Sequence, residues 1–406
     1  MAVGPGDLPD FSPIKGMRIG IASAGIKKPG RKDIVLLELV EGTTTVGVFT
    51  RNQFCAAPVV LAKRHLASAA PRFLLINTGN ANAGTGPQGL IDAEACCQAL
   101  ALETGCTAEQ VLPFSTGVIG EPLPVMKVTG ALSAAVADLS TTHWSEAAAG
   151  IMTTDTRPKG ATASVQVDGK LVSISGISKG AGMIRPNMAT MLGFVATDAP
   201  IETGVLQQLL TEAVEQSFNR ITIDSDTSTN DSCILSATGQ VDVSPMSSLD
   251  QPEWQEFRQA LCQLMQNLAH AIVRDGEGAT KFVEVRVDEA ASTQEALDVA
   301  YTIAHSPLVK TALFASDPNW GRILACVGRA GLVDLQLDAV NIFLNDVCIV
   351  ENGGRAASYT EAAGQTVMNQ EEITIGVKLG RGTVSDQVWT TDLSHEYVRI
   401  NAEYRT

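Results

Sequence analysis

The middle of the chain places a β-hairpin, an irregular loop and a buried strand in direct succession, and this order limits the possible folds strongly. Alternating apolar residues over 165–177 flank Asp168-Gly169, a pair that supplies the positive φ angles of a tight hairpin turn. Two glycines and a proline then disfavour a regular helix over 179–190. The apolar run 191–196 predicts a buried strand. Thr190 therefore stands at the head of a core strand, behind an irregular loop.

Segments of helical period alternate with such strands along the rest of the chain. Apolar stripes predict helices over 205–218 and 254–273, and Val283, Val285 and Val287 alternate as a half-buried strand. Ser292 with Glu295 forms a capping box at the head of another helix. The class is therefore α/β or α+β.

Composition and charge indicate a globular chain and exclude several kinds of partner. The 406 residues suffice for two or three domains at ~150 residues each. The net charge of −15 repels phosphate backbones and anionic membranes, so nucleic acid is not an expected partner. There is no apolar run of ~18 residues and no signal-peptide pattern, and the eight cysteines form no CxxC pair. We therefore expect a cytoplasmic protein that does not enter membranes.

The familiar metal and cofactor motifs are missing from the sequence. The five histidines form no HExxH pattern, and no phosphate-binding glycine loop follows a predicted strand. Residues 176–180 fit the G-x-S-x-G pattern of a nucleophile elbow, but the glycines and proline that follow exclude the helix that this motif requires. We expect neither a metal nor a cofactor.

Thr190 can nevertheless carry acyl-transfer chemistry if it becomes an N-terminal residue. A threonine hydroxyl needs a neighbouring base to act as a nucleophile. Attack of this hydroxyl on the small Ala189 residue's carbonyl, followed by ester hydrolysis, would free an α-amine with a pKa of roughly 7.7–8.0. By residue type alone, however, Thr190 would be an ordinary strand threonine.

Residues 179–194, KGAGMIRPNMATMLGF, resemble the signature of the ornithine acetyltransferase family, also called the glutamate N-acetyltransferase family of arginine biosynthesis. Ala181 stands where serine is common in this family. Further stretches match the family in order along essentially the whole chain: 78–83 (TGNANA), 115–120 (STGVIG), 153–156 (TTDT), 224–227 (DSDT), 274–281 (RDGEGATK), 317–322 (DPNWGR) and 400–406 (INAEYRT).

The resemblance implies an N-terminal-nucleophile-like fold, a layered α/β/β/α core with a second, smaller α/β domain. It implies self-cleavage between Ala189 and Thr190 into chains 1–189 and 190–406, which stay in one assembly with two copies of each. The expected activity moves acetyl from N2-acetylornithine to glutamate through acetyl-Thr190, and the residues leave open whether acetyl-CoA is also a donor.

The resemblance also assigns roles to residues. Thr116 and Gly117 match the oxyanion-hole pair, and a glycine N–H and a threonine hydroxyl are suitable donors to a developing negative charge. Thr153, Lys179, Thr190, Glu277, Asn401 and Thr406 match substrate contacts, which would place the C-terminus in the site.

Two other functions stay open at this point. A self-cleaving aminopeptidase or amidase would use the same threonine with water as acceptor, but would not need Lys179, Glu277 or the C-terminal contacts. An uncleaved binding or scaffold protein would remain a single 42.7 kDa chain.

Overall fold

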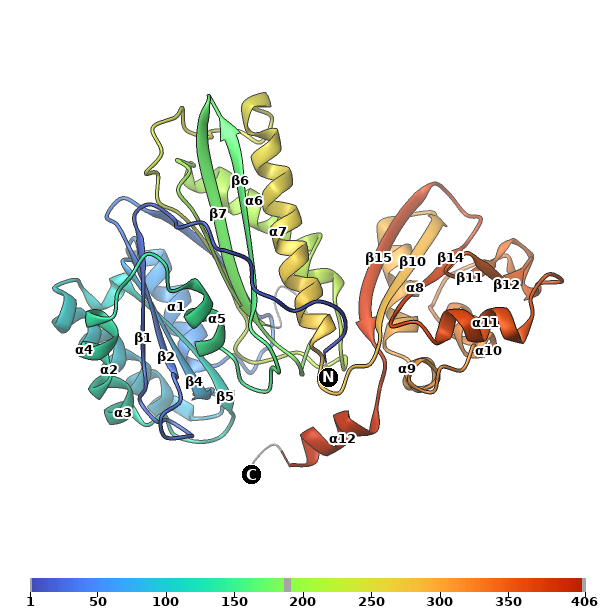
Figure 1. Ribbon diagram of the computed structural model, residues 1–406, viewed down its shortest axis with the longest axis horizontal. Helices are drawn as coiled ribbons and strands as arrows, with labels where there is room; N and C mark the ends of the chain where they lie inside the picture. The colour runs from blue at the N-terminus through green and yellow to red at the C-terminus, as the bar shows by residue number, and fades with distance from the viewer. Residues whose placement is uncertain (1, 186–190, 404–406) are drawn as a thin grey trace. The chain divides into compact units, whose positions relative to one another are not determined.

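The computed structural model describes residues 2–185 and 191–403. The chain forms two compact units. The larger unit comprises Gly6–Asn219 and Asp226–Ile272, and the smaller one comprises Arg220–Ser225, the chain from Val273 onward and the first few residues. Figure 1 shows both units, with most of their strands and helices labelled.

Two sheets form the centre of the larger unit. The first has the order β1-β2-β4-β5, with β4 and β5 parallel: β1 (Met17–Ala22), β2 (Ile34–Leu39), β4 (Phe73–Asn80) and β5 (Val111–Val118). The second has the order β3-β9-β8-β7-β6, with β8 and β9 parallel: β3 (Thr44–Phe49), β6 (Lys159–Val167), β7 (Lys170–Lys179), β8 (Leu192–Thr197) and β9 (Ser232–Ala237).

The two sheets face each other across an apolar core. Leu37, Ile76 and Phe114 of the first sheet cluster with Ile177 and Phe194 of the second. The rings of Phe114 and Phe194 meet edge to face with their centroids 5.1 Å apart, a favourable arrangement for aromatic pairs. Every residue of β8 is buried, as expected for a strand covered on both faces.

Helices cover the outer faces of both sheets. The outer face of the first sheet packs against α1 (Ala57–Ser68), α2 (Gly86–Thr104), α3 (Val125–Gly130) and α4 (Leu132–Ala137). On the second sheet, α6 (Thr203–Glu215) packs against β3 and β9, and Leu268 of α7 (Gln255–Arg274) lies against Gly176 of β7. A short helix, α5 (Trp144–Gly150), contacts β1 and β7. The predicted α/β/β/α layering is confirmed.

The smaller unit contains one mixed sheet with helices around it. Its strand order is β13-β12-β11-β14-β10-β15, formed by β10 (Phe282–Ala290), β11 (Asn341–Leu344), β12 (Val347–Glu351), β13 (Gly354–Arg355), β14 (Glu372–Lys378) and β15 (Val384–Thr391). The helices are α8 (Thr293–Ala304), α9 (Pro307–Phe314), α10 (Trp320–Gly328), α11 (Glu361–Met368) and α12 (His395–Ala402). The expected second, smaller α/β domain is thus confirmed.

The local predictions agree with these elements. Asp168 and Gly169 have φ angles of 48° and 74° and turn β6 into β7. The predicted apolar stripe of α6 is buried, although the helix ends at Glu215. Half of the capping box forms: Ser292 accepts the Glu295 N–H, whereas the Glu295 carboxylate accepts the N–H of Ala291.

The predicted chemical division at residue 190 does not coincide with the boundary between the two units. Strands β7 and β8, which precede and follow Thr190 in the sequence, pair antiparallel with Lys179 opposite Leu192. The unit boundary instead falls near Val273. The division into chains 1–189 and 190–406 stays a prediction.

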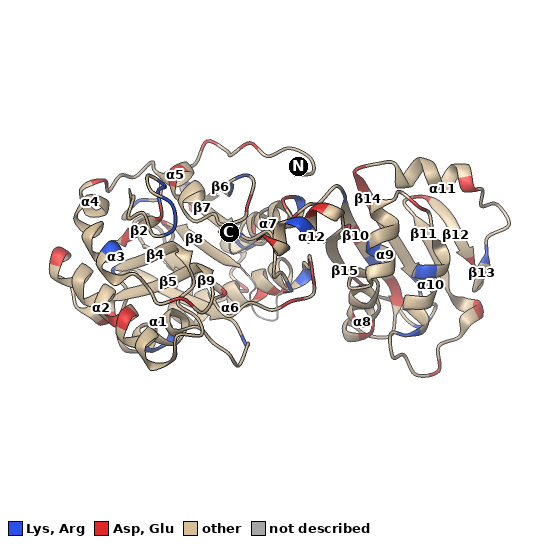
Figure 2. Cartoon of the chain, turned by 90° about the horizontal axis from the view of Figure 1, so that it is seen from below, with Lys and Arg blue, Asp and Glu red and all other residues tan. Residues whose placement is uncertain are grey.

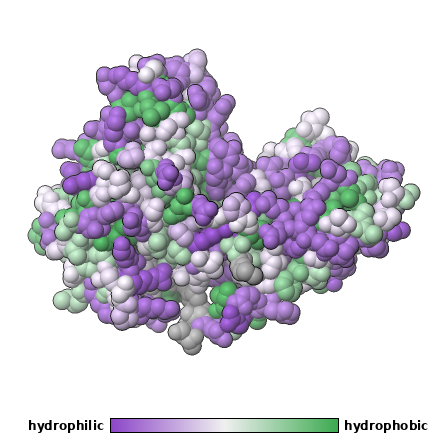
Figure 3. Space-filling view, in the orientation of Figure 1, coloured by the Kyte–Doolittle hydropathy of each residue, from purple (hydrophilic) through white to green (hydrophobic). Residues whose placement is uncertain are grey.

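The large hydrophobic side chains that are exposed are scattered over the surface of the protein. Figure 3 shows a face that is mostly hydrophilic or neutral, with small separate apolar spots. Exposed examples are Phe54 in the connection between β3 and α1, Leu102 on α2 and Met126 on α3. Within the described residues, no helix is long and apolar enough to cross a membrane.

Candidate active site

Thr116 and Gly117 lie at the carboxyl end of β5, where that strand crosses very close to the end of β4. Gly117 has a φ of 138°, and a Cβ atom on it would stand 2.3 Å from the carbonyl carbon of Gly79. The pairing of β4 with β5 shifts register at this point. Only glycine fits such a backbone approach, so the structure requires Gly117 whatever its chemical role.

Lys179, the last residue of β7, joins two of the predicted site residues. Its Nζ donates to the Thr116 hydroxyl at 2.9 Å and to the Thr153 hydroxyl at 3.4 Å. An ammonium group only donates, so the Thr116 oxygen accepts this bond and its own hydrogen can point toward another acceptor. The structure thus brings Thr116, Gly117, Thr153 and Lys179 together at adjoining strand and loop ends of the larger unit.

Asp155 holds the backbone next to Thr153 and Lys179 in position. Its carboxylate accepts the Thr153 N–H at 2.9 Å, the Gly180 N–H at 2.8 Å and the Lys159 ammonium at 2.6 Å. Burial opposes ionisation of Asp155, but the charges of Lys159 and Lys179 and these hydrogen bonds outweigh it and hold its pKa well below the usual range. Asp155 is therefore a buried, charged anchor for the backbone on both sides of the site.

Asn230 connects the second sheet to the strand that carries Thr116. Its side-chain amide donates to the carbonyl of Ala81 at 2.6 Å and to that of Ser115 at 2.9 Å. Two residues later, the Ser232 N–H donates to the Met191 carbonyl at 2.9 Å. One short segment thus fixes the start of β8 relative to the end of β5.

Asp231, between those two residues, is a buried carboxyl group in a different electrostatic setting. It is 3% exposed, and its Oδ2 atom has no hydrogen-bond partner among the described residues. Burial raises its pKa well above the usual range, although the nearby Lys179 charge and hydrogen bonds from Ser228 oppose this. Asp231 is consequently a buried carboxyl group with a raised pKa next to the strand that follows Thr190.

Glu277 and Asn401 meet in the smaller unit. The Asn401 amide donates to Glu277 Oε2 at 2.7 Å. Helix α12, which carries Asn401, begins at a cap in which Ser394 accepts the Tyr397 N–H and donates to the carbonyl of Gly278. Asn401 is exposed and Glu277 is buried. The glycine-rich 274–281 segment thus holds the C-terminal helix.

Three predicted site residues cannot be placed. Ala189, Thr190 and Thr406 lie outside the described residues. Ala181, which replaces the family's common serine, is buried. Met191 is the first described residue after the predicted nucleophile, and its backbone is paired to Ser232 as described above.

Sequence reasoning gave no role to Asp155, Asn230 or Asp231. The matching stretch 153–156 contains Asp155, but only Thr153 was assigned a contact. The only sequence feature that could mark Asp231 as a site residue is its place in an Asn-Asp pair directly before an apolar strand. Its burial and its proximity to Lys179 depend on pairing between strands that are distant in sequence.

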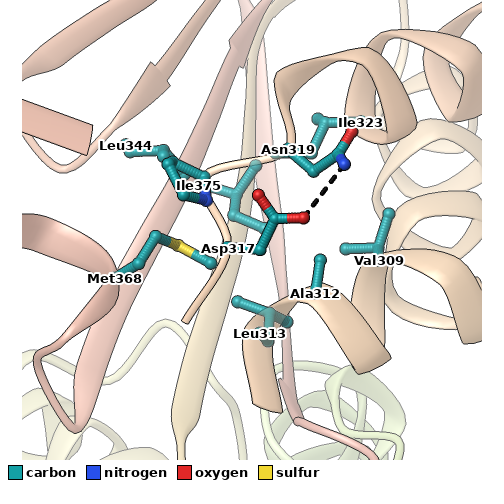
Figure 4. Close-up of a pocket in the computed structure, with 10 residues that line it drawn as sticks. Val309, Ala312, Leu313, Asp317, Asn319, Ile323, Leu344, Met368 and Ile375 are labelled. Atoms are coloured by element: carbon teal, nitrogen blue, oxygen red, sulfur yellow. Dashed lines mark hydrogen bonds between the residues drawn. The ribbon is translucent and has the colours of Figure 1, made fainter. Parts of the chain in front are cut away.

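The 317–322 stretch serves the structure of the smaller unit. Figure 4 shows Asp317 accepting a hydrogen bond from the Asn319 amide, 3.0 Å long, beside a small, mostly apolar cavity. Asn319 also caps α10. The cavity volume is about 10 Å³, which is room for one water molecule and not for an amino acid. Within the described chain, no three His, Cys, Asp or Glu side chains are arranged to hold a metal ion.

Comparison with known proteins shows similarity to the arginine biosynthesis family over nearly the whole chain. The model of the ArgJ family matches residues 18–406. The arginine biosynthesis bifunctional protein ArgJ of Pseudomonas fluorescens (strain Pf0-1) is 60% identical over 406 residues, covering all of both chains. The protein of the same name from Methylococcus capsulatus is 57% identical over 394 residues, covering 97% of this chain and 96% of that one.

Solved structures include related proteins. A crystal structure of ArgJ from Bacillus halodurans is 38% identical, with a TM-score of 0.49, covering 52% of this chain and 97% of that one. The ornithine acetyltransferase of Mycobacterium tuberculosis, crystallised with ornithine, is 33% identical, with a TM-score of 0.40, covering 45% and 96%. The family match and the identity to full-length relatives confirm the resemblance seen in the sequence: the chain belongs to the ArgJ family, that of the arginine biosynthesis bifunctional proteins.

Proposed function

We propose that the protein is a glutamate N-acetyltransferase of arginine biosynthesis that moves acetyl from N2-acetylornithine to glutamate through an ester on Thr190. The observation that carries the proposal is the 2.9 Å hydrogen bond from Lys179 to the Thr116 hydroxyl. This bond leaves the hydroxyl hydrogen available to a developing oxyanion at the end of β5. Met191, which directly follows Thr190 in the sequence, immediately precedes β8, the strand paired with the one that carries Lys179. The ArgJ membership supports the same activity.

Activation begins with cleavage of the chain at Ala189–Thr190. The Thr190 oxygen attacks the Ala189 carbonyl carbon, the C–N bond breaks, and Ala189 becomes an ester on the threonine. Water hydrolyses that ester and leaves chains 1–189 and 190–406 with a new α-amine on Thr190. The amine has a reference pKa of roughly 7.7–8.0, which suits a proton shuttle near neutral pH.

Acetyl transfer then takes two similar steps. The α-amine accepts the hydroxyl proton while the Thr190 oxygen attacks the acetyl carbonyl of N2-acetylornithine, and ornithine leaves with that proton on its nitrogen. The amine of glutamate attacks the acetyl ester, and N-acetylglutamate departs as the threonine hydroxyl is restored. Both tetrahedral anions would be stabilised by the Thr116 hydroxyl and the Gly117 N–H.

Charged and polar groups recognise the two amino acids in this scheme. Lys179 and Thr153 would donate to a substrate carboxylate, and Asp155 would keep both in position. Glu277 would pair with the side-chain ammonium of ornithine, oriented by its hydrogen bond from Asn401. Thr406 would be a further substrate contact. The working enzyme would contain two copies of each chain in the cytoplasm and would also accept acetyl from acetyl-CoA.

Intact-mass analysis and N-terminal sequencing test the cleavage. The wild type should give two chains, the second beginning with Thr190. Thr190→Ala should remain a single chain without acetyl transfer, whereas Thr190→Ser should still cut because it keeps the hydroxyl. Normal cleavage of Thr190→Ala would refute the assignment.

Acetyl transfer itself is tested by supplying the donors separately. Wild-type enzyme given N2-acetylornithine without glutamate should gain one acetyl group on the 190–406 chain, and glutamate should remove it. Thr116→Val, which keeps the shape but removes the hydroxyl, should lower kcat by about 10²–10³ without preventing folding. Release of free acetate instead of N-acetylglutamate would favour the amidase alternative.

A further inference from the structure

Positive charge is concentrated in the loop between β1 and β2. Within residues 27–32, four of six side chains are basic: Lys27, Lys28, Arg31 and Lys32. The whole chain has 29 basic and 44 acidic residues, so such a cluster opposes the general charge of the protein. Figure 2 shows these basic residues together beside β2, with a further blue band on α3. We name residues 23–32 the basic loop.

The basic loop has a fixed backbone and outward-facing lysines. The Asp33 carboxylate accepts the N–H groups of Ala24 at 2.6 Å and Ile26 at 2.7 Å. From α3, the Lys127 ammonium donates to the carbonyl of Gly25 at 2.7 Å and adds a fifth positive charge. The side chains of Lys27, Lys28 and Lys32 are exposed. Thus Asp33 is engaged with the backbone, and the loop's charge faces solvent.

The basic loop lies directly beside the candidate active site of the same unit. A Cβ atom placed on Gly79 would stand 3.2 Å from Lys27 Cβ, and Gly79 is paired with Gly117. At the other end of the loop, the Arg31 guanidinium donates to the Met152 carbonyl, directly before Thr153. The loop therefore spans from the oxyanion-hole strands to the segment that holds Thr153 and Lys179.

The two amino-acid substrates do not explain this charge. Lys179 and Thr153 suffice for the α-carboxylate of either substrate. Glutamate then adds one side-chain carboxylate, which needs at most one or two of the loop's four basic groups, and ornithine adds a cation that the loop would repel. A coenzyme A thioester has a different shape: its acetyl group sits at one end of a flexible arm and its phosphates at the other. Lys and Arg are the usual partners of phosphate, and an acidic protein needs a local positive region to attract such an anion.

We propose that the basic loop binds the phosphate groups of acetyl-CoA, so that the thioester reaches Thr190 past Gly79 and Gly117. This inference rests on the proposed acetyl-transfer function and assigns a site to its second donor. The Thr190 oxygen attacks the thioester carbonyl, the C–S bond breaks, and coenzyme A leaves as a thiol that takes up the proton held by the α-amine.

Charge reversal at two loop positions tests the proposal. Lys28 and Lys32 are exposed and form no ion pair within the described chain, so Lys28→Glu/Lys32→Glu should fold normally. The control, Lys15→Glu/Arg64→Glu, changes the net charge equally and also alters two exposed basic side chains. Lys15 precedes β1, at the end of that strand away from the loop, and Arg64 lies on α1 next to His65, whose ring bonds the Val111 carbonyl at the start of β5. Both doubles are compared with the wild type by steady-state kinetics and by calorimetric binding of coenzyme A.

The loop double should raise KM for acetyl-CoA and Kd for coenzyme A about tenfold, as expected for losing two partly solvated phosphate contacts. Its kcat, its exchange between N2-acetylornithine and glutamate, and its use of S-acetylpantetheine, which lacks phosphates, should stay unchanged. Equal effects in the control, or an unchanged KM for acetyl-CoA in the loop double, would overturn the proposal.

Two further outcomes separate the proposals from each other. If wild-type protein exchanges acetyl between N2-acetylornithine and glutamate but binds no coenzyme A, the basic-loop proposal is wrong and the proposed function stands. If that exchange is absent while coenzyme A binds through the loop, the proposed function fails and the binding site stands.

Discussion

Replacing Asp155 by asparagine should strongly destabilise the larger unit, because the change removes one half of a buried ion pair. The Asp155 and Lys159 side chains are 0% and 1% exposed, with Oδ1 and Nζ 2.6 Å apart. Asparagine keeps the size of the side chain but turns an amide donor toward Lys159, Thr153 N–H or Gly180 N–H, each of which is itself a donor. Breaking a buried pair in this way costs about 3–5 kcal/mol.

Urea unfolding at pH 7 measures this loss as a change in the free energy of unfolding. Asp242→Asn is the matched control, because Asp242 forms an exposed ion pair with Lys170, and it should leave the unfolding midpoint unchanged. Asp155→Asn/Lys159→Met should recover much of the lost stability, since no unpaired ammonium then remains in the interior.

The ion pair should also make the free energy of unfolding depend on pH in a defined direction. Because the pKa of Asp155 is lowered in the folded state, its contribution to stability is present above the unfolded value of roughly 3.9 and is lost as the pH falls below it. Asp155→Asn should flatten this acid limb. A loss below about 1 kcal/mol at pH 7, or an unchanged acid limb, would refute the reasoning that this ion pair anchors the site.

Three further results should follow from the structure. Gly117→Ala should lower the free energy of unfolding by at least about 2 kcal/mol, because the added Cβ would overlap Gly79. The control Gly130→Ala should be neutral or stabilising, because a Cβ there meets open space. Equal melting temperatures for the two variants would contradict this reasoning. Burial lowers the pKa of Lys310 to about 8, so the unfolded chain binds more protons between pH 8 and roughly 10.4, and stability should rise by up to about 3 kcal/mol over that range. Lys310→Met should abolish this rise, and a flat wild-type profile would disprove it. For Asp231, whose folded pKa is raised, stability should fall as the pH increases above about 4; Asp231→Asn should remove that slope with little change at acidic pH, and a steep destabilisation at pH 4 would show that the carboxyl is ionised.

Local sequence signals were sufficient for many individual elements. The Asp168-Gly169 turn, the buried stripe of α6 and the all-buried strand β8 each follow from a few neighbouring residues and their periodicity. The motif around Thr190 indicated the family, and with it the layered architecture. These features are encoded within short segments, so a single sequence reveals them.

The arrangement of the site depended on contacts between segments that are far apart in the chain. Lys179 reaches Thr116 across 63 positions, and Asn230 reaches Ser115 across 115. The opposite pKa shifts of Asp155 and Asp231 cannot be read from their neighbours in the sequence. Both side chains are buried, but folding places the Lys159 ammonium against Asp155 and leaves an oxygen of Asp231 without a donor among the described residues. The sequence by itself thus determined the segments and the family. The tertiary structure decided which charges are paired, because desolvation and pairing arise only when distant strands pack together.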